Sequence, residues 1–245
     1  MCSLLQEVGG TVGYLLDAGA GTPVFRSEYQ SGMHANGNAF VNELMTSQRV
    51  TGLSSLWAVL SHPDSDHWRL LDWDTTLLSA AQRVFLPSGA PALAFSSPRV
   101  KPKVLGSGSV THHFNVRNSL AVHRSQPVKS DRNGECLVSV VRCDRKVALL
   151  SGDYVYDRMT VDGDPAIAAA AAGSLDGVVV PHHGDAASAH SVPSPATTGI
   201  SPAFFSAGLH AGYGHPTTAS INAHANFAVV NHHTKDDVKE HPLIP

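Results

Sequence analysis

Short apolar runs bounded by Gly, Pro or charged residues recur along the chain and predict β-strands. One pair of runs flanks Gly9-Gly10 and another flanks the polar segment 142–145, so each pair predicts a hairpin. The predicted strands are, in chain order, 1–8, 11–16, 56–60, 83–87, 119–123, 136–141, 146–150, 177–181, 200–207 and 227–231.

Helical patterns lie between these strands. The segments 20–39 and 89–110 are rich in Gly, Pro, Ser or Asn and are predicted to be irregular. Strands that alternate with helices favour the α/β class. The predicted helices are 40–50, 166–172 after the cap Asp164-Pro165, 217–225, and a helix that begins at Trp68.

Side chains of metal-ligand type gather just beyond strand 56–60. Two histidines and two aspartates fall within six residues, at His62, Asp64, Asp66 and His67. Imidazole nitrogens together with carboxylate oxygens suit Zn²⁺, or Mn²⁺ and Fe²⁺ where carboxylates are plentiful. The segment therefore predicts a divalent metal site at the edge of a sheet.

The same segment resembles a known motif. His62-x-Asp64-x-Asp66-His67 is similar to the His-x-His-x-Asp-His motif of the metallo-β-lactamase superfamily, with Asp64 in place of the second histidine. In the form Ser-His-Pro-Asp-x-Asp-His it resembles the metallo-β-lactamase-like domain of ComEC-type competence proteins and their free-standing relatives. Four further segments match the superfamily in the same order, namely Asp17-x-Gly19, Gly152-Asp153, His182-His183-Gly184 and Tyr213-Gly214-His215-Pro216.

The resemblance implies a role for each of these residues. Asp153 would bridge two metal ions, and Asp17 would orient the histidine-rich loop without binding metal itself. One of His182 and His183 would complete the metal shell and the other would donate to the leaving oxygen or a phosphate; we favour His182 as the ligand, and the residues leave the choice open. Asp66 and His183 are the catalytic candidates. The expected metal ligands are His62, Asp64, Asp66, His67, Asp153, His182 and His215.

The chemistry of these side chains also favours a metal site apart from the resemblance. Asp64, Asp66 and Asp153 brought together without cations would repel one another and raise one another's pKa. A pair of divalent cations would neutralise them. Asp64 replaces a nitrogen ligand, and no histidine matches the first ion's usual third ligand. The spare histidines near the middle of the chain are His112, His113 and His123.

The resemblance implies an αββα sandwich of two mixed β-sheets flanked by helices, formed by residues 1–245 as a single domain. The family's first N-terminal strand is expected to be missing, which leaves one sheet edge open. Trp68-Arg69 stands where relatives have glycines and is expected to make the rim of the metal loop bulkier. Asp185 replaces the family's serine after the His-His-Gly motif, and Ala211 replaces an asparagine.

The implied activity is hydrolysis by two divalent ions, Zn²⁺ or Mn²⁺, that activate a hydroxide. The lead hypothesis is a metal-dependent phosphodiesterase or nuclease, whose substrate is a phosphoester such as DNA or a nucleotide. One alternative is a lactone, amide or thioester hydrolase on the same fold. Another is a degenerate, non-catalytic binding domain.

Composition limits the partners. The formal net charge of −3 gives no global basic field for nucleic acid, so a polyanion would need a local cationic path. No apolar run approaches the roughly 20 residues of a membrane helix and no secretory signal is visible, which predicts a cytoplasmic protein without a membrane segment. The three cysteines lack metal spacing and are expected to be reduced thiols. The candidate cationic path comprises Arg99, Lys101, Lys103, Arg117, Arg124, Lys129 and Arg132.

Overall fold

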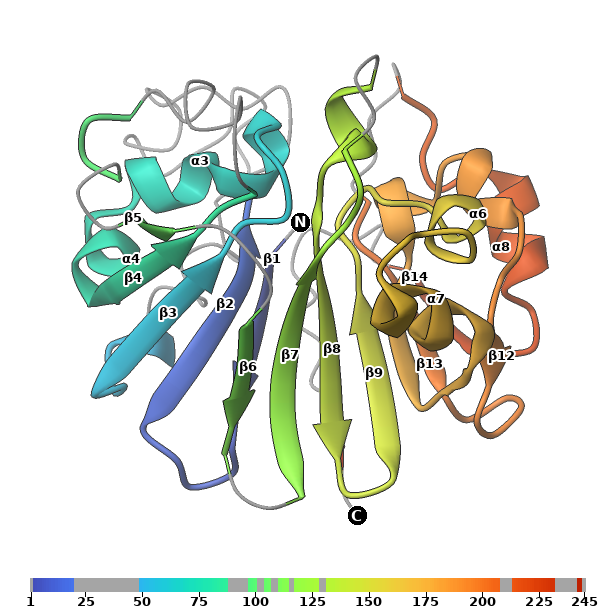
Figure 1. The fold of residues 1–245 in the computed structure, drawn as a ribbon, viewed down its shortest axis with the longest axis horizontal. Coiled ribbons are helices and arrows are strands. Elements are labelled where there is room, and N and C mark those ends of the chain that lie inside the picture. Colours follow the sequence, from blue (N-terminus) through green and yellow to red (C-terminus); the bar gives the residue numbers. More distant parts are fainter. Residues whose placement is uncertain are drawn as a thin grey trace. The chain divides into compact units, whose positions relative to one another are not determined.

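The structure is a computed structural model in which the chain divides into two compact units (Figure 1). Unit 1 is Met1–Ser107 with Thr234–Lys239, and unit 2 is Gly108–His233 with Glu240–Pro245. Most of the predicted helix 40–50 lies outside the described residues, as do segment 20–39 and Ala211. The structure describes residues 2–19, 49–87, 97–100, 104–106, 110–114, 117–127, 131–207, 213–231 and 242–243.

Unit 1 is built on a mixed five-stranded sheet. The predicted hairpin around Gly9 is confirmed, since the first two strands pair antiparallel, whereas the remaining neighbours pair parallel. The strand order follows the chain, and consecutive parallel strands require crossover connections. The strands are β1 (Cys2–Gln6), β2 (Val12–Ala18), β3 (Ser55–Val59), β4 (Ala81–Phe85) and β5 (Val104–Gly106).

Two helices pack against this sheet, α3 (Ser65–Trp73) and α4 (Thr75–Ala80). Leu70 and Leu71 of α3 are fully buried in one core cluster with Leu15 of β2 and further leucines and valines of the unit. Asp74, which lies between the two helices, is the N-cap of α4: its carboxylate accepts the backbone N–H groups of Thr76 and Leu77, at 2.8 and 2.9 Å. The apolar face of α3 therefore packs into the core, while the first turn of the helix carries polar residues.

Unit 2 is built on a mixed seven-stranded sheet in the order β14-β13-β11-β9-β8-β7-β6. One half is parallel and the other is an antiparallel meander, in which β8 and β9 form the predicted hairpin. The strands are β6 (Val110–His113), β7 (Asn118–Arg124), β8 (Leu137–Cys143), β9 (Lys146–Leu150), β11 (Gly177–Val179), β13 (Pro202–Phe205) and β14 (Ala228–Asn231), with a separate short pair β10 (Ser174–Leu175) and β12 (Ser194–Pro195).

Three helices lie beside the parallel half of this sheet, α6 (Tyr156–Met159), α7 (Pro165–Ala172) and α8 (Thr218–Ala223) (Figure 1). The predicted cap of α7 is confirmed, because the Asp164 side chain accepts the Ala166 N–H at 2.8 Å and Gly173 follows the last helical residue. Buried residues of the helices and strands form one core cluster, which includes Ile167 and Leu149.

A buried histidine joins α6 and α8 inside this core. His224 has no exposed surface, and its Nδ1–H donates to the Ser220 carbonyl at 2.7 Å. Its Nε2 therefore accepts the Tyr156 hydroxyl at 3.1 Å, and the Phe205 ring packs against it edge-on. Burial lowers the pKa of His224 below its ordinary value of 6.5.

Replacing His224 by glutamine is expected to flatten the acid side of the stability curve. As the pH falls below about 6.5, the unfolded imidazole gains a proton that the buried one does not, so the free energy of unfolding decreases. For one proton the slope approaches about 1.4 kcal/mol per pH unit. Urea unfolding at several pH values in chelator should show a shallower slope for His224→Gln than for the wild type. The surface variant His190→Gln is the control, and equal slopes for His224→Gln and wild type would contradict the prediction.

The predicted α/β class with two mixed sheets is confirmed. Several details differ: α3 begins at Ser65 and not at Trp68, and β5 lies in a segment predicted to be irregular. Helices α4 and α6 and strand β6 were not predicted. The prediction that residues 1–245 form a single domain stays a prediction. Within the described ranges, no helix has both the length and the apolar character needed to cross a membrane.

Candidate metal centre

In unit 1, two parallel strands bring Asp17 and Ser61 together. β2 and β3 pair in register Leu16 with Val59, so Asp17 near the end of β2 and Ser61 just after β3 meet at one sheet edge. Asp17 has a φ of 59°, a left-handed conformation that aspartate tolerates better than most residues. Its carboxylate accepts the Ser61 backbone N–H at 2.6 Å through Oδ1 and the Ser61 hydroxyl at 2.9 Å through Oδ2.

The same pair fixes both histidines of the metal loop. His67 Nδ1 lies 2.8 Å from Asp17 Oδ2, and because a carboxylate only accepts, Nδ1 carries the proton. The Ser61 hydroxyl gives its proton to Asp17, so at 3.0 Å it accepts from His62 Nδ1. Both imidazoles, which are fully buried, therefore present the Nε2 lone pair. This is the atom that a metal ion requires.

Asp17 remains ionised because of these contacts. Burial alone would raise its pKa, but the charge interaction and hydrogen bond with His67 and the Ser61 N–H outweigh burial. The pKa of Asp17 is consequently lowered from its ordinary value of 3.8. The role predicted for Asp17, orientation of the loop, is consistent with these contacts.

Asp64 and Asp66 lie at the start of α3. Asp64 is the N-cap residue, but its side chain makes no cap hydrogen bond and lies 3.8 Å from His62 Nε2. Asp66 lies in the first turn, where a negative charge is favoured, and 4.0 Å from His67 Nε2. The structure therefore brings all four predicted ligands of unit 1 together, with each carboxylate near one imidazole.

Trp68 does not form a bulky rim, which corrects the prediction. Its ring is buried in the core of unit 1, and its Nε1–H donates to the Pro63 carbonyl at 3.0 Å. Trp68 thus anchors the metal loop to the core of unit 1, because its large apolar ring is buried there and its single N–H donor bonds the loop backbone. Arg69 is exposed.

In unit 2, three parallel strands, β9, β11 and β13, end at one sheet edge. Asp153 follows β9 through a turn in which Gly152 takes a left-handed φ of 60°. The His182 N–H donates to the Gly152 carbonyl at 3.0 Å, which links the Gly-Asp turn to the His-His-Gly turn after β11. Asp153 is 6% exposed.

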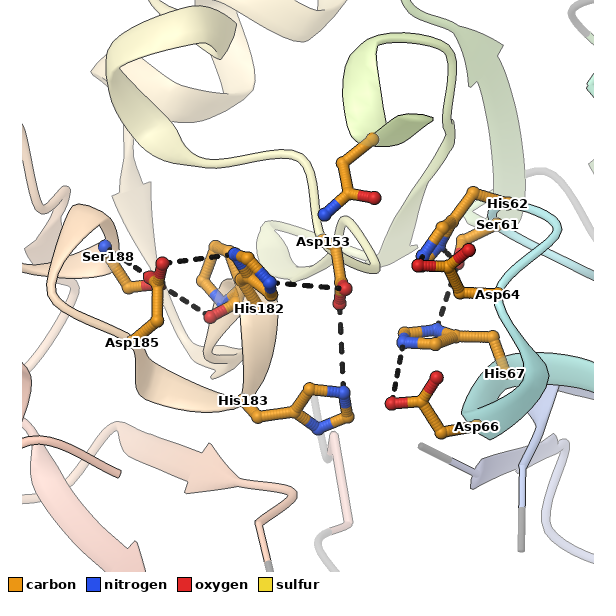
Figure 2. Close-up of polar contacts among 12 residues, drawn as sticks. Ser61, His62, Asp64, Asp66, His67, Asp153, His182, His183, Asp185 and Ser188 are labelled. Atoms are coloured by element: carbon orange, nitrogen blue, oxygen red, sulfur yellow. Dashed lines mark hydrogen bonds and ion pairs between the residues drawn. The ribbon is translucent and has the colours of Figure 1, made fainter. Parts of the chain in front are cut away.

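His182 and His183 both lie close to Asp153 (Figure 2). Their Nε2 atoms are 3.7 and 3.8 Å from its two carboxylate oxygens. His183 Nδ1 donates to the Ser206 carbonyl at 2.6 Å, and His182 Nδ1 lies 3.0 Å from Asp185 Oδ2. The two histidines have φ values of 46° and 55°, a strained backbone that is typical of functional turns.

His215 lies beside His182 in this group. Its ring lies 6.0 Å from that of His182 and 6.1 Å from that of Tyr213, with the tyrosine ring nearly parallel. Burial lowers the pKa of His215 below 6.5; His182 and His183 lower it further, while Asp185 and Asp153 oppose the shift. The buried His215 Nδ1 has no hydrogen-bond partner within the part of unit 2 that the structure describes.

The donor set in each unit fits divalent metal ions. Four histidines have Nδ1 held by a hydrogen-bond acceptor, which leaves Nε2 for a ligand. His215 offers a buried Nδ1 that has no hydrogen-bond partner among the described residues. Carboxylates at 3.7 to 4.0 Å from these nitrogens are close enough for a shared cation and too far for a hydrogen bond. Clusters of metal-binding type are therefore present in both units.

Most of the spare histidines and cations that the structure describes contact residues outside the candidate metal centre. His123 Nδ1 lies 3.2 Å from Asp164, beside the start of α7, and His112 packs against Phe114. Arg124 pairs with Glu135 at 2.9 Å, Arg99 donates to the Asp72 carbonyl, and Arg117 is exposed. Lys101, Lys103 and Lys129, and the side chains of His113 and Arg132, lie outside the described residues.

Sequence reasoning missed the residues that hold the histidines from behind: Ser61, Asp185, Ser188 and Ser206. Ser61 stands within the Ser-His-Pro-Asp-x-Asp-His segment, and the sequence marks Asp185 only as a departure from the family's serine. Their partners become visible once the strand register is known, because Asp17 and Ser61 are separated by 44 positions in the sequence.

No family model matches the chain, and no curated protein matches it. Human tRNase Z, short form, is 12% identical, with a TM-score of 0.39 over 73% of this chain and 69% of its own. CmlA, a diiron β-hydroxylase from Streptomyces venezuelae, is 14% identical, with a TM-score of 0.44 over 73% of this chain; the match spans 32% of CmlA. The metallo-β-lactamase fold protein YhfI from Bacillus subtilis is 13% identical, with a TM-score of 0.52 over 96% of this chain and 88% of YhfI. This last likeness shows that the chain has the metallo-β-lactamase fold.

Proposed function

We propose that the chain is a metal-dependent phosphodiesterase or nuclease that binds two divalent ions, Zn²⁺ or Mn²⁺. The observation that carries the proposal is that His62, His67 and His182 each have Nδ1 engaged by a hydrogen-bond acceptor, so that each Nε2 is preorganised as a ligand. The ligands would be His62, Asp64, Asp66 and His67 of unit 1 and Asp153, His182 and His215 of unit 2. That both sets serve the same pair of ions rests on the family resemblance.

The phosphodiester substrate class is supported by two features of the sequence. The Ser-His-Pro-Asp-x-Asp-His segment resembles that of ComEC-type competence proteins, and Asp64 makes the ligand set richer in oxygen than in the lactamases. When bound, two divalent ions would supply a nucleophile at neutral pH and stabilise charge on the phosphoryl oxygens.

The chain's own residues would position the substrate and move protons. His183 keeps one proton on Nδ1 for the Ser206 carbonyl, so its Nε2 donates to a leaving oxygen only when the ring is doubly protonated. Asp66 and Asp153 would hold the ions and add negative charge that balances them. Asp17 and Ser61 would keep His62 and His67 in one tautomer throughout the reaction.

Removing two of the carboxylates is expected to abolish phosphodiester cleavage. The chain is stripped with chelator, reloaded with Mn²⁺ or Zn²⁺, and assayed on bis(p-nitrophenyl) phosphate. The double variant Asp66→Asn with Asp153→Asn should lose at least about a hundredfold in kcat/KM, because each change alone weakens metal binding.

Asp144→Asn is the matched control, since Asp144 lies in the exposed β8–β9 turn and should keep wild-type activity. Equal activity in the double variant would contradict the proposal. Hydrolysis of a lactone or thioester by the metal-loaded chain, without phosphodiester cleavage, would favour a carbonyl hydrolase instead.

A further inference from the structure

Asp185 follows the His-His-Gly turn and contacts the first of its histidines. Its Oδ2 lies 3.0 Å from His182 Nδ1 (Figure 2). Its Oδ1 accepts the Ser188 backbone N–H at 2.9 Å and lies 2.8 Å from the Ser188 hydroxyl. The two oxygens therefore have separate partners, one on each side of the carboxylate.

Ser188 fixes the orientation of this carboxylate. The serine is fully buried, and its hydroxyl also lies 2.6 Å from the Pro181 carbonyl, which precedes His182. A backbone N–H cannot change its direction without moving the 3-10 turn Ala187–Ala189. Oδ1 is therefore held by Ser188, and Oδ2 is the oxygen that faces the imidazole.

We propose that Asp185 is a positioning residue that holds His182 in the Nδ1–H tautomer and so presents the Nε2 lone pair on the side of Asp153. A carboxylate can only accept at Oδ2, so the proton of a neutral His182 must reside on Nδ1. Nε2 is then the atom 3.7 Å from Asp153 Oδ2. The consequence for metal binding rests on the proposed function, whereas the tautomer itself does not.

His183 provides an internal reference in the same turn. Its Nδ1 donates to the backbone carbonyl of Ser206, which no change at Asp185 removes. A general disturbance of the turn would alter both histidines. A positioning role of Asp185 alters the tautomer of His182 and leaves that of His183 as it is.

The isosteric change Asp185→Asn distinguishes positioning from packing. The Ser188 N–H requires an acceptor, so the asparagine carbonyl oxygen takes the place of Oδ1 and its NH2 group faces His182 Nδ1. That NH2 group donates, which forces the His182 proton onto Nε2. Asparagine in place of an orienting aspartate is known to trap the wrong histidine tautomer in serine proteases.

The test is long-range ¹H–¹⁵N correlation NMR of the metal-free protein at about pH 8.5, where an ordinary histidine is neutral. His182 is assigned with His182→Gln. The expected result is Nδ1–H for His182 in the wild type, Nε2–H in Asp185→Asn, and a mixture in Asp185→Ala, with His183 unchanged in all three. Zn²⁺ titration should then show a loss of affinity of about 10- to 100-fold in Asp185→Ala and a larger loss in Asp185→Asn.

The proposal is overturned if wild-type His182 shows Nε2–H, or if Asp185→Asn keeps Nδ1–H. Wild-type Zn²⁺ affinity in Asp185→Asn would overturn it as well. Ser188→Ala keeps both the carboxylate and the backbone N–H that holds Oδ1, so it should keep Nδ1–H on His182. The mixture expected in Asp185→Ala preserves the test if Asp185→Asn fails to fold; Asp144→Asn is the control. Failure of the proposed function would look different, since the wild type would bind no metal while the tautomer pattern persisted.

Discussion

Replacing Asp17 by asparagine is expected to destabilise the protein by about 2–4 kcal/mol and to weaken metal binding by at least about tenfold. The buried carboxylate accepts from the Ser61 N–H, the Ser61 hydroxyl and His67 Nδ1. An asparagine retains one accepting oxygen and adds a donor where only acceptors fit. The cost is a buried unsatisfied group together with a shifted proton on His67.

The two effects are measured by urea unfolding in chelator and by Zn²⁺ titration of the folded protein. Asp74→Ala is the matched control, because Asp74 is also a buried aspartate of unit 1 and its carboxylate accepts the backbone N–H groups that cap α4. It should cost about 0.5–2 kcal/mol and leave metal affinity unchanged. Equal metal affinity in Asp17→Asn and the wild type would contradict the orienting role of Asp17.

Gly184→Ala is expected to destabilise unit 2 by about 2–5 kcal/mol and to displace His183. Gly184 has a φ of 80°, and an added Cβ would lie 2.5 and 2.7 Å from Phe205 ring carbons and 2.9 Å from the Pro216 Cβ. The Gly184 carbonyl also accepts the Thr217 N–H at 2.8 Å, so the turn is fixed on two sides. The Phe205 ring cannot shift without a large cost, because it is fully buried.

Gly199→Ala separates the steric part from the backbone part. Gly199 has a similar φ of 72°, but a Cβ there meets nothing within 4 Å. It should cost only about 1 kcal/mol, the backbone contribution alone. Thermal unfolding and phosphodiesterase assays of both variants check the prediction, and equal losses for the two alanine variants would count against it.

Elements marked by local signals were predictable from the sequence. Helix α7 has the predicted bounds because Asp164, Pro165 and Gly173 mark its ends within a few positions. The β8–β9 hairpin likewise follows from two apolar runs around a short polar turn. The predicted start of α3 was wrong by about one turn. Its first turn contains the polar residues Asp66 and His67, and the apolar pattern that indicates a helix begins only at Trp68.

The candidate metal ligands were predictable from the sequence, but the residues that orient them were not. Residue type and spacing identify the candidate ligands of the metal loop, which are His62, Asp64, Asp66 and His67, and also the His182–His183 pair. The supporting residues depend on long-range pairing: Ser61 acts through Asp17 on a neighbouring strand, and Asp185 acts only once the turn after β11 has folded back. A sequence motif shows which ligand residues are present. The tautomers of its histidines depend on strand register and turn geometry, which the motif does not contain.

The most direct test of the proposed dinuclear centre is the metal content of the purified chain, measured by elemental analysis after loading with Zn²⁺ or Mn²⁺ and removal of the excess. We expect about two ions per chain, and fewer in the double variant Asp66→Ala with Asp153→Ala. A wild-type chain that retains no divalent ion under any loading condition would contradict the proposal.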